Sequence, residues 1–291
     1  MKVLRLLTRF CNFLCLALFV YLLIFPHRAS EPTRAAIEFC ARTLVPSLFV
    51  YGVLSKLIVN MPISDKIARL IGYSGFTLLI GLLCGAPLGA KTAYSLYKSR
   101  RADKKYSEFL CSFCNNASAS FVIGFVGAEL LGDIRAGVRL FVYQIISACL
   151  TACVMKRIMY GKEKLPLVSA VKSPKTDLRE AISDSANAMI GICSCAVFFM
   201  AVGSALTDVL RLGAVPNALL KSLLEFSSGC AAAADLGAFA NALCAFSIGF
   251  LGLSVVLQVK WVTCGSLSLK PYLAGKALSG SIITLLAVIF G

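Results

Sequence analysis

The sequence predicts an all-α, polytopic membrane protein built from two repeats of inverted topology. Of its 291 residues 58% are hydrophobic and only 15% are charged, whereas a soluble domain carries about 25% charged residues. Long apolar runs recur along the chain, as membrane-spanning helices require. Each half also holds a short, glycine-broken apolar run followed by an interrupted one. Such breaks must be buried in protein or line a cavity, because lipid satisfies no backbone hydrogen bonds.

The net charge of +15 comes from basic residues that lie between the apolar runs. Positive charge in this position sets the orientation of membrane spans, so we expect no nucleic-acid partner. Most of the thirteen cysteines lie inside apolar runs, where cysteine acts as a small apolar residue. Cys111 and Cys114 form a single CxxC, and the one histidine, His27, is far away in sequence. We therefore expect no metal, no cofactor and, without a nucleophile motif, no enzyme activity.

The N-terminal region, residues 1–35, predicts one transmembrane helix. Lys2, Arg5 and Arg9 place the N-terminus in the cytoplasm, and the span over residues 6–26 leads outward. The segment after it lacks a clear small-x-small cleavage site, so we expect an uncleaved span rather than a signal peptide.

The first repeat covers residues 36–158 and contains three spans and one hairpin. Residues 36–59 return to the cytoplasm, residues 107–131 lead outward, and residues 134–158 return to a strongly basic loop. The span over residues 107–131 is interrupted by polar residues near its centre.

The hairpin of the first repeat is predicted for residues 76–90. This apolar run is shorter than the roughly 20 residues that a spanning helix needs, and both of its flanks are basic. A run with both ends on one side is re-entrant, and Gly85 and Gly89, on either side of a proline, permit a sharp reversal at its tip.

The second repeat, residues 189–291, shows the same order of elements in the opposite orientation. It follows a basic cytoplasmic linker and amphipathic lead-in over residues 159–188. The predicted elements are an outward span at 189–210, a hairpin entered from outside at 218–236, a broken returning span at 239–257, and an outward span at 272–290. Broken segments in corresponding places of inverted repeats indicate the binding site of a secondary transporter.

Asn115 and Asn116 lie in the middle of an apolar span and are followed by Ser118. Asparagine and serine compete with the helix for backbone hydrogen bonds, so an unwound turn here would offer amide groups to a substrate. The alternative is that these side chains join helices by hydrogen bonds. Adjacent asparagines point to different helix faces, which favours the binding site.

Glu225 lies in the second hairpin, where an ionisable residue at membrane depth is costly and usually functional. It is the candidate for binding a coupling Na⁺ or H⁺. Alternatively it lies at the headgroup level and pairs with Lys221. Both interpretations stay open from the sequence. Ser227 and Ser228 add hydroxyl groups to the candidate substrate site, and Gly229 adds a turn.

Three further residues complete the predicted substrate site. Lys91 follows the first hairpin tip and either approaches an anionic substrate or simply begins a basic loop, which its position favours. Ser254 and Gln258 line the pathway, unless Gln258 is an interfacial residue. Helix N-termini at the breaks would favour an anion even without a lysine.

Four motifs in this order resemble the YlbJ (SpoVV) family of sporulation integral membrane proteins. They are residues 85–91 (GAPLGAK), 113–116 (FCNN) with 121–124 (FVIG), 224–229 (LEFSSG) and 252–259 (GLSVVLQV). That family belongs to the nucleoside-recognition Gate domain group, which looks like a reduced concentrative nucleoside transporter. The resemblance implies that each repeat is of the Gate type.

The resemblance also implies a function. It indicates secondary transport of a small anionic solute, with dipicolinic acid as the best candidate, across the outer forespore membrane of a sporulating bacterium. A transporter of nucleosides or another small metabolite is an alternative, and a non-transport membrane scaffold is a third. The paired broken helices speak against the scaffold. The expected partners are the solute, the lipid bilayer and a coupling Na⁺ or H⁺; the oligomeric state is open.

Overall fold

The computed structural model describes residues 2–59, 61–166, 168 and 177–291. Within these residues all regular structure is helical, with no strand. Four helices are long and apolar enough to cross a membrane, and a bent pair in the described part of the chain raises this to five. The prediction of an all-α, polytopic membrane protein is therefore confirmed.

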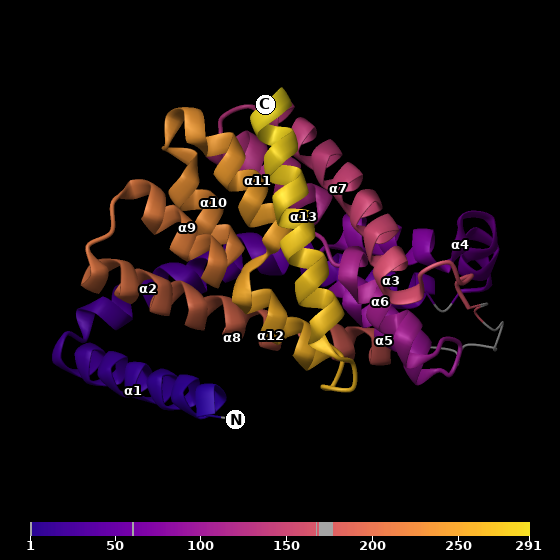
Figure 1. Ribbon diagram of the computed structural model, residues 1–291, viewed down its shortest axis with the longest axis horizontal. Coiled ribbons are helices and arrows are strands. Elements are labelled where there is room, and N and C mark those ends of the chain that lie inside the picture. Colours follow the sequence, from indigo (N-terminus) through magenta and orange to yellow (C-terminus); the bar gives the residue numbers. More distant parts are fainter. Residues whose placement is uncertain (1, 60, 167, 169–176) are drawn as a thin grey trace.

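The N-terminal helices lead into a bent span. Helix α1 (Lys2–Ile24) lies at the edge of the molecule (Figure 1). Helix α2 (His27–Phe39), the π-helical turn η1 (Cys40–Leu44) and α3 (Val45–Val59) follow it. The axis bends by 47° between the helical stretches on either side of residues 45–47, where Pro46 removes a backbone donor. The predicted span over residues 36–59 is the larger part of this bent pair.

A helical hairpin turns at the predicted tip, but its helices extend beyond the predicted residues 76–90, from Pro62 through a kink at Gly72 to Lys98. Helix α4 (Pro62–Cys84) ends at Gly85, whose φ of +83° is a conformation that glycine adopts readily. Helix α5 (Leu88–Lys98) begins directly after the turn.

The predicted interruption of the next span is also present. Helix α6 (Lys104–Cys114) ends at Asn115, and the chain resumes as the π-helical segment η2 (Ser120–Leu130). Helix α7 (Ile134–Tyr160) is then a continuous candidate span.

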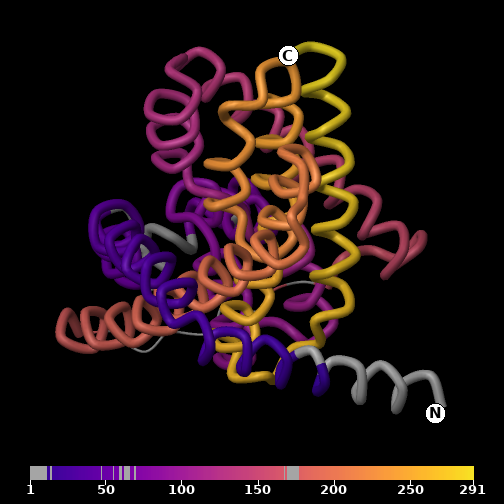
Figure 2. Tube along the Cα trace, turned by 90° about the vertical axis from the view of Figure 1, so that its left-hand side faces the viewer, coloured from indigo at the N-terminus to yellow at the C-terminus, as the bar shows by residue number. Residues whose placement is uncertain are grey.

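The second half contains the corresponding elements. The predicted lead-in and outward span form one helix, α8 (Leu178–Leu210). The hairpin consists of α9 (Ala214–Leu224) and α10 (Phe226–Ala234), which meet at Glu225. The prediction that Gly229 supplies the turn is wrong, because Gly229 lies inside α10 and the helix breaks at Glu225, whose side chain caps α10. After a short 3₁₀ turn, η3 (Gly237–Phe239), the predicted broken span forms α11 (Ala240–Phe250) and α12 (Gly252–Val262). Helix α13 (Leu269–Phe290) ends the chain and lies beside α11 in both views (Figures 1 and 2).

The α2–α3 segment lies antiparallel to α8, with an ion pair at each end. Arg28 pairs with Asp208 at 2.6 Å, and Lys56 pairs with Glu180 at 3.2 Å. Each pair joins residues that the loop charges place on the same side of the membrane. The relative direction of these two helices therefore agrees with the topology predicted from the sequence.

Helices α7 and α13 are likewise antiparallel. The Tyr143 hydroxyl donates to the Phe290 carbonyl at 2.9 Å, and the Ser147 hydroxyl donates to the Ser279 carbonyl at 2.9 Å. This direction also agrees with the predicted topology, in which residues 134–158 return and residues 272–290 lead outward. Figure 1 shows α13 upright and α7 inclined beside it, whereas α2 and α8 run across them. The contacts therefore give the relative directions within each pair, but no common axis for the two pairs.

Candidate functional site

The break after α6 is held open by a side chain from α7. Gln144 accepts a hydrogen bond from the Ala117 amide at 3.2 Å and donates one to the Ala117 carbonyl at 3.0 Å. The Asn116 amide nitrogen donates to the Phe113 carbonyl at 2.9 Å. Buried side chains thus replace the helical hydrogen bonds that this turn lacks, as a break inside a membrane protein requires.

The first hairpin packs directly against this break. The Ala90 amide donates to Asn115 Oδ1 at 3.4 Å. A Cβ atom on Gly89 would overlap the Cys114 carbonyl, and one on Gly85 would lie 3.0 Å from the Ser118 Cβ. Four predicted site residues, Gly85, Gly89, Asn115 and Ser118, are therefore brought together, with Asn116 adjoining.

At the second hairpin, the Glu225 side chain is buried with 1% of its surface exposed. Its carboxylate accepts hydrogen bonds from the Ser227 hydroxyl and from the Ser228 amide, the latter at 2.8 Å. It therefore caps the N-terminus of α10, where negative charge is favourable.

The interpretation that Glu225 forms an ion pair with Lys221 is wrong. The contact between the two residues is a backbone hydrogen bond from the Glu225 amide to the Lys221 carbonyl at 2.7 Å. Within the described residues, Glu225 takes part in none of the ion pairs.

The second hairpin also packs against the broken helix that follows it. A Cβ atom on Gly252, the first residue of α12, would lie 3.0 Å from the Leu224 carbonyl oxygen, and one on Gly229 would overlap Ser222. The hydroxyls of Ser222 and Ser247 are 2.6 Å apart across the same contact. In both halves, therefore, a hairpin break touches the break of the next helix.

The two broken pairs meet through an aromatic contact. Phe121, after the first break, and Phe226, after Glu225, have ring centroids 4.8 Å apart in a tilted arrangement. Rings at this separation attract one another beyond the area that they bury. Contacts thus run without interruption from the first hairpin through both breaks to the second hairpin.

Three predicted site residues make none of the contacts described above between a hairpin and a break. They are Lys91, Ser254 and Gln258. Lys91 is part of α5 rather than the first residue of a loop, so that interpretation is wrong; its Nζ donates to the Asp184 carbonyl of α8 at 3.3 Å. Gln258 donates to the Ser254 hydroxyl at 3.1 Å on α12. Only 3% of Gln258 is exposed, so the interfacial interpretation of this residue does not hold.

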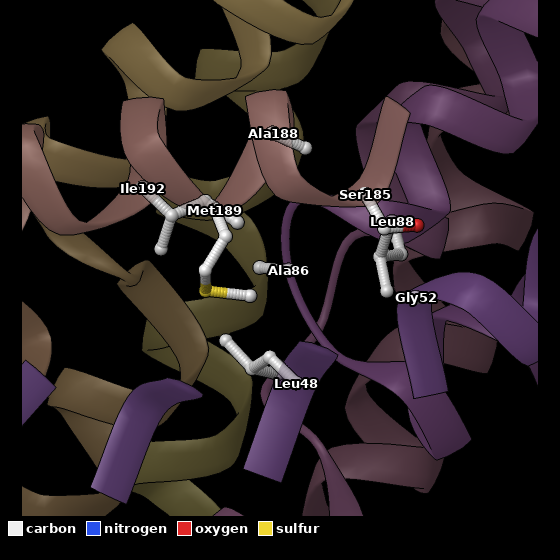
Figure 3. Close-up of a pocket in the computed structure, with 8 residues that line it drawn as sticks. All are labelled: Leu48, Gly52, Ala86, Leu88, Ser185, Ala188, Met189 and Ile192. Atoms are coloured by element: carbon white, nitrogen blue, oxygen red, sulfur yellow. The ribbon is translucent and has the colours of Figure 1, made fainter. Parts of the chain in front are cut away.

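A small cavity lies where the first hairpin meets α3 and α8 (Figure 3). The cavity is small: its volume accessible to the centre of a water molecule is about 10 Å³, so it holds roughly one water. The buried Ser185 hydroxyl at this place finds no hydrogen-bond partner among the residues that the structure describes. The lining residues are Leu48, Gly52, Ala86, Leu88, Ser185, Ala188, Met189 and Ile192. The hairpin tip is thus packed closely on α8, without room for a solute between them.

The sequence interpretation missed three buried polar residues near the first break: Gln144, Tyr272 and Lys276. Lys276 is 1% exposed, and its Nζ donates to Asn116 Oδ1 at 3.4 Å. The sequence contained a signal for Lys276, because a lysine inside a predicted membrane span is a functional candidate by default. The predicted span over residues 272–290 was assigned no such candidate.

The chain resembles a curated protein over part of its length. It is 25% identical over 126 residues to the sporulation integral membrane protein YlbJ of Bacillus subtilis (strain 168), which is 40% of this chain and 31% of that protein. The match thus spans less than a third of the relative's length. No family model matches the chain, and no solved structure matches it. Together with the apolar helices, the similarity to an integral membrane protein supports a multi-pass membrane protein.

Proposed function

We propose that this chain is a secondary transporter that moves a small anionic solute across a bacterial membrane. The observation that carries the proposal is the meeting of two hairpin-and-break pairs at Phe121 and Phe226. Secondary transporters bind their solutes where broken helices of two repeats meet near the midplane of the bilayer. A scaffold or an enzyme has no need for this arrangement.

The mechanism that fits is alternating access. The two hairpins enter from opposite sides in the predicted topology, and each packs on a break that carries buried polar groups. Movement of one hairpin at a time would open the breaks to one side of the membrane. Close packing of the first hairpin on α8 corresponds to a state closed on the predicted cytoplasmic side.

Dipicolinic acid is the solute we propose first, in agreement with the family resemblance and with the word sporulation in the relative's name. It is a small, planar dicarboxylate. Carboxylate oxygens accept hydrogen bonds from amide groups, and Asn115 supplies such a group at the first break, where Asn116 supports the turn through the Phe113 carbonyl. The membrane would then be the outer forespore membrane, and the direction from the mother cell toward the spore.

Glu225 is the candidate for the coupling ion. It is buried at the second break, and hydroxyl and amide donors surround its carboxylate. A carboxylate in this position either binds Na⁺ or takes up H⁺. The transmembrane gradient of that ion then drives the movement of the solute.

Uptake into proteoliposomes tests the proposal. The purified chain is reconstituted and exposed to labelled dipicolinate or labelled uridine, with empty liposomes as the control. We expect dipicolinate uptake that the double variant Asn115→Ala/Asn116→Ala loses while its membrane abundance stays normal. Uptake of uridine alone would overturn dipicolinate as the solute but would support the transport function. Uptake of neither solute, under imposed Na⁺ and H⁺ gradients, would contradict the proposal.

A further inference from the structure

A lysine and a tyrosine of α13 are buried against the first break. Lys276 and Tyr272 lie one helical turn apart and are 1% and 0% exposed. The two helices approach closely here, because a Cβ atom on Gly275 would overlap the Ser112 carbonyl of α6. This approach places the Lys276 ammonium against the asparagine pair.

Hydrogen-bond donors outnumber acceptors at this place. Among the described residues, the Asn115 amide nitrogen and the Tyr272 hydroxyl find no other hydrogen-bond partner, and they lie beside one another. A bond from this amide to the tyrosine oxygen would still leave the tyrosine O–H without an acceptor. The Lys276 ammonium has three donors and one hydrogen bond, to Asn116, within the described residues. Buried donors without acceptors are costly, and a buried charge without a counter-ion is more so.

Within the described residues, no acidic side chain balances the charge of Lys276. None of the ion pairs in the described part of the chain includes it. The Asn115 oxygen accepts from the Ala90 amide of the first hairpin, so its nitrogen is on the side of Tyr272 and is the group free to donate to a ligand there.

We propose that Lys276, Asn115 and Tyr272 bind one carboxylate group of the transported solute. The two oxygens of a carboxylate accept several hydrogen bonds at once, and charge-assisted bonds to an ammonium are the strongest of these. The site rests on the proposed transport function and names the residues that would recognise the anion. Because Asn115 also contacts the first hairpin, the bound carboxylate and the hairpin share one side chain.

Binding measured without a membrane gradient tests this site separately from transport. The purified chain in lipid nanodiscs is titrated with labelled dipicolinate, with picolinate and the neutral pyridine-2,6-dicarboxamide as competitors. We expect Lys276→Met to weaken dipicolinate binding by about tenfold or more, because a charged hydrogen bond is lost. Picolinate should compete, and the diamide should not.

Two further variants keep the test decisive. Asn116→Asp has nearly the same shape as the native residue and places a carboxylate at the ammonium, although it loses the donor to the Phe113 carbonyl. In the folded variant it should also weaken binding, which gives a second test of the site beside Lys276→Met. Lys270→Met, at an exposed position in the first turn of the same helix, should bind as the unaltered chain does.

The outcomes separate the two proposals. Unaltered affinity in folded Lys276→Met and Asn116→Asp would overturn the carboxylate site, while dipicolinate uptake by the native chain would leave the transport function standing. A native chain that takes up uridine but neither binds nor takes up a carboxylate would overturn both the site and the anionic solute.

Discussion

Lys91 of the first hairpin donates a hydrogen bond from its Nζ to the backbone carbonyl of Asp184 in α8 at 3.3 Å. The Asp184 carboxylate itself pairs with Lys56 of α3. The residues around Asp184 therefore hold three elements together: the hairpin, α8 and the α2–α3 segment. All three residues lie in or beside segments that the loop charges place on the cytoplasmic side.

We expect Lys91→Met to open the first hairpin toward the cytoplasm more often. The loss of one partly exposed polar contact is worth about 1 kcal/mol or less, or up to roughly fivefold in population. The measurement is the rate at which a maleimide labels Cys84, which is buried at the end of α4. Lys98→Met, at an exposed position on the same helix, is the control. An unchanged labelling rate in Lys91→Met would show that this contact does not keep the first hairpin closed.

At Glu225 we expect substitutions by glutamine and by alanine to differ in stability and agree in function. Glu225→Gln would retain an oxygen that accepts from the Ser228 amide, whereas Glu225→Ala would lose the cap, at a cost of about 0.5–2 kcal/mol. Both remove the charge, so gradient-driven uptake should fall about tenfold or more. Thermal unfolding in detergent and uptake under imposed Na⁺ and H⁺ gradients measure the two effects. Full uptake by Glu225→Gln would exclude this residue as the coupling site.

Gly275→Ala should destabilise the protein, because its Cβ would overlap the Ser112 carbonyl where α13 crosses α6. Overpacking of this kind costs about 1–3 kcal/mol. The matched control is Gly124→Ala in η2, where no atom lies within 4 Å of the added Cβ, and the expected change is about 0.5 kcal/mol or less. The midpoint of thermal unfolding compares the two variants, and equal midpoints would contradict the close crossing.

Cysteine labelling from the two sides of the membrane tests the inverted topology. Gly85 and Gly229 are poor positions for the label, because a Cβ at either one crowds its neighbours. Lys98 and Asp235, the exposed residues that end the two hairpins, are better. In a chain with Cys264→Ser, we expect an impermeant maleimide to reach Lys98→Cys from the cytoplasm and Asp235→Cys from outside. Labelling of both from one side would reject the inverted repeats.

Several features of the fold were predictable because they depend on local chemistry. The apolar runs predict helices in a membrane. Gly85 marks the turn of the first hairpin because glycine tolerates a positive φ. Asn115 and Asn116 mark the break after α6 because their amides compete with the helix. Each of these signals acts within a few residues of its own position in the chain.

The sequence by itself thus determined the class of protein, the order of its helices and the breaks at Gly85 and at Asn115, but not the break at Glu225, which it placed at Gly229. Only the tertiary structure decided which breaks touch, that Glu225 caps α10 instead of pairing with Lys221, and that Lys91 contacts α8. It also brought Lys276 to Asn116, which is 160 positions away in the chain. The reason is physical: hydropathy and turn chemistry are local, whereas a buried polar group takes its partner from whichever helix the packing places beside it.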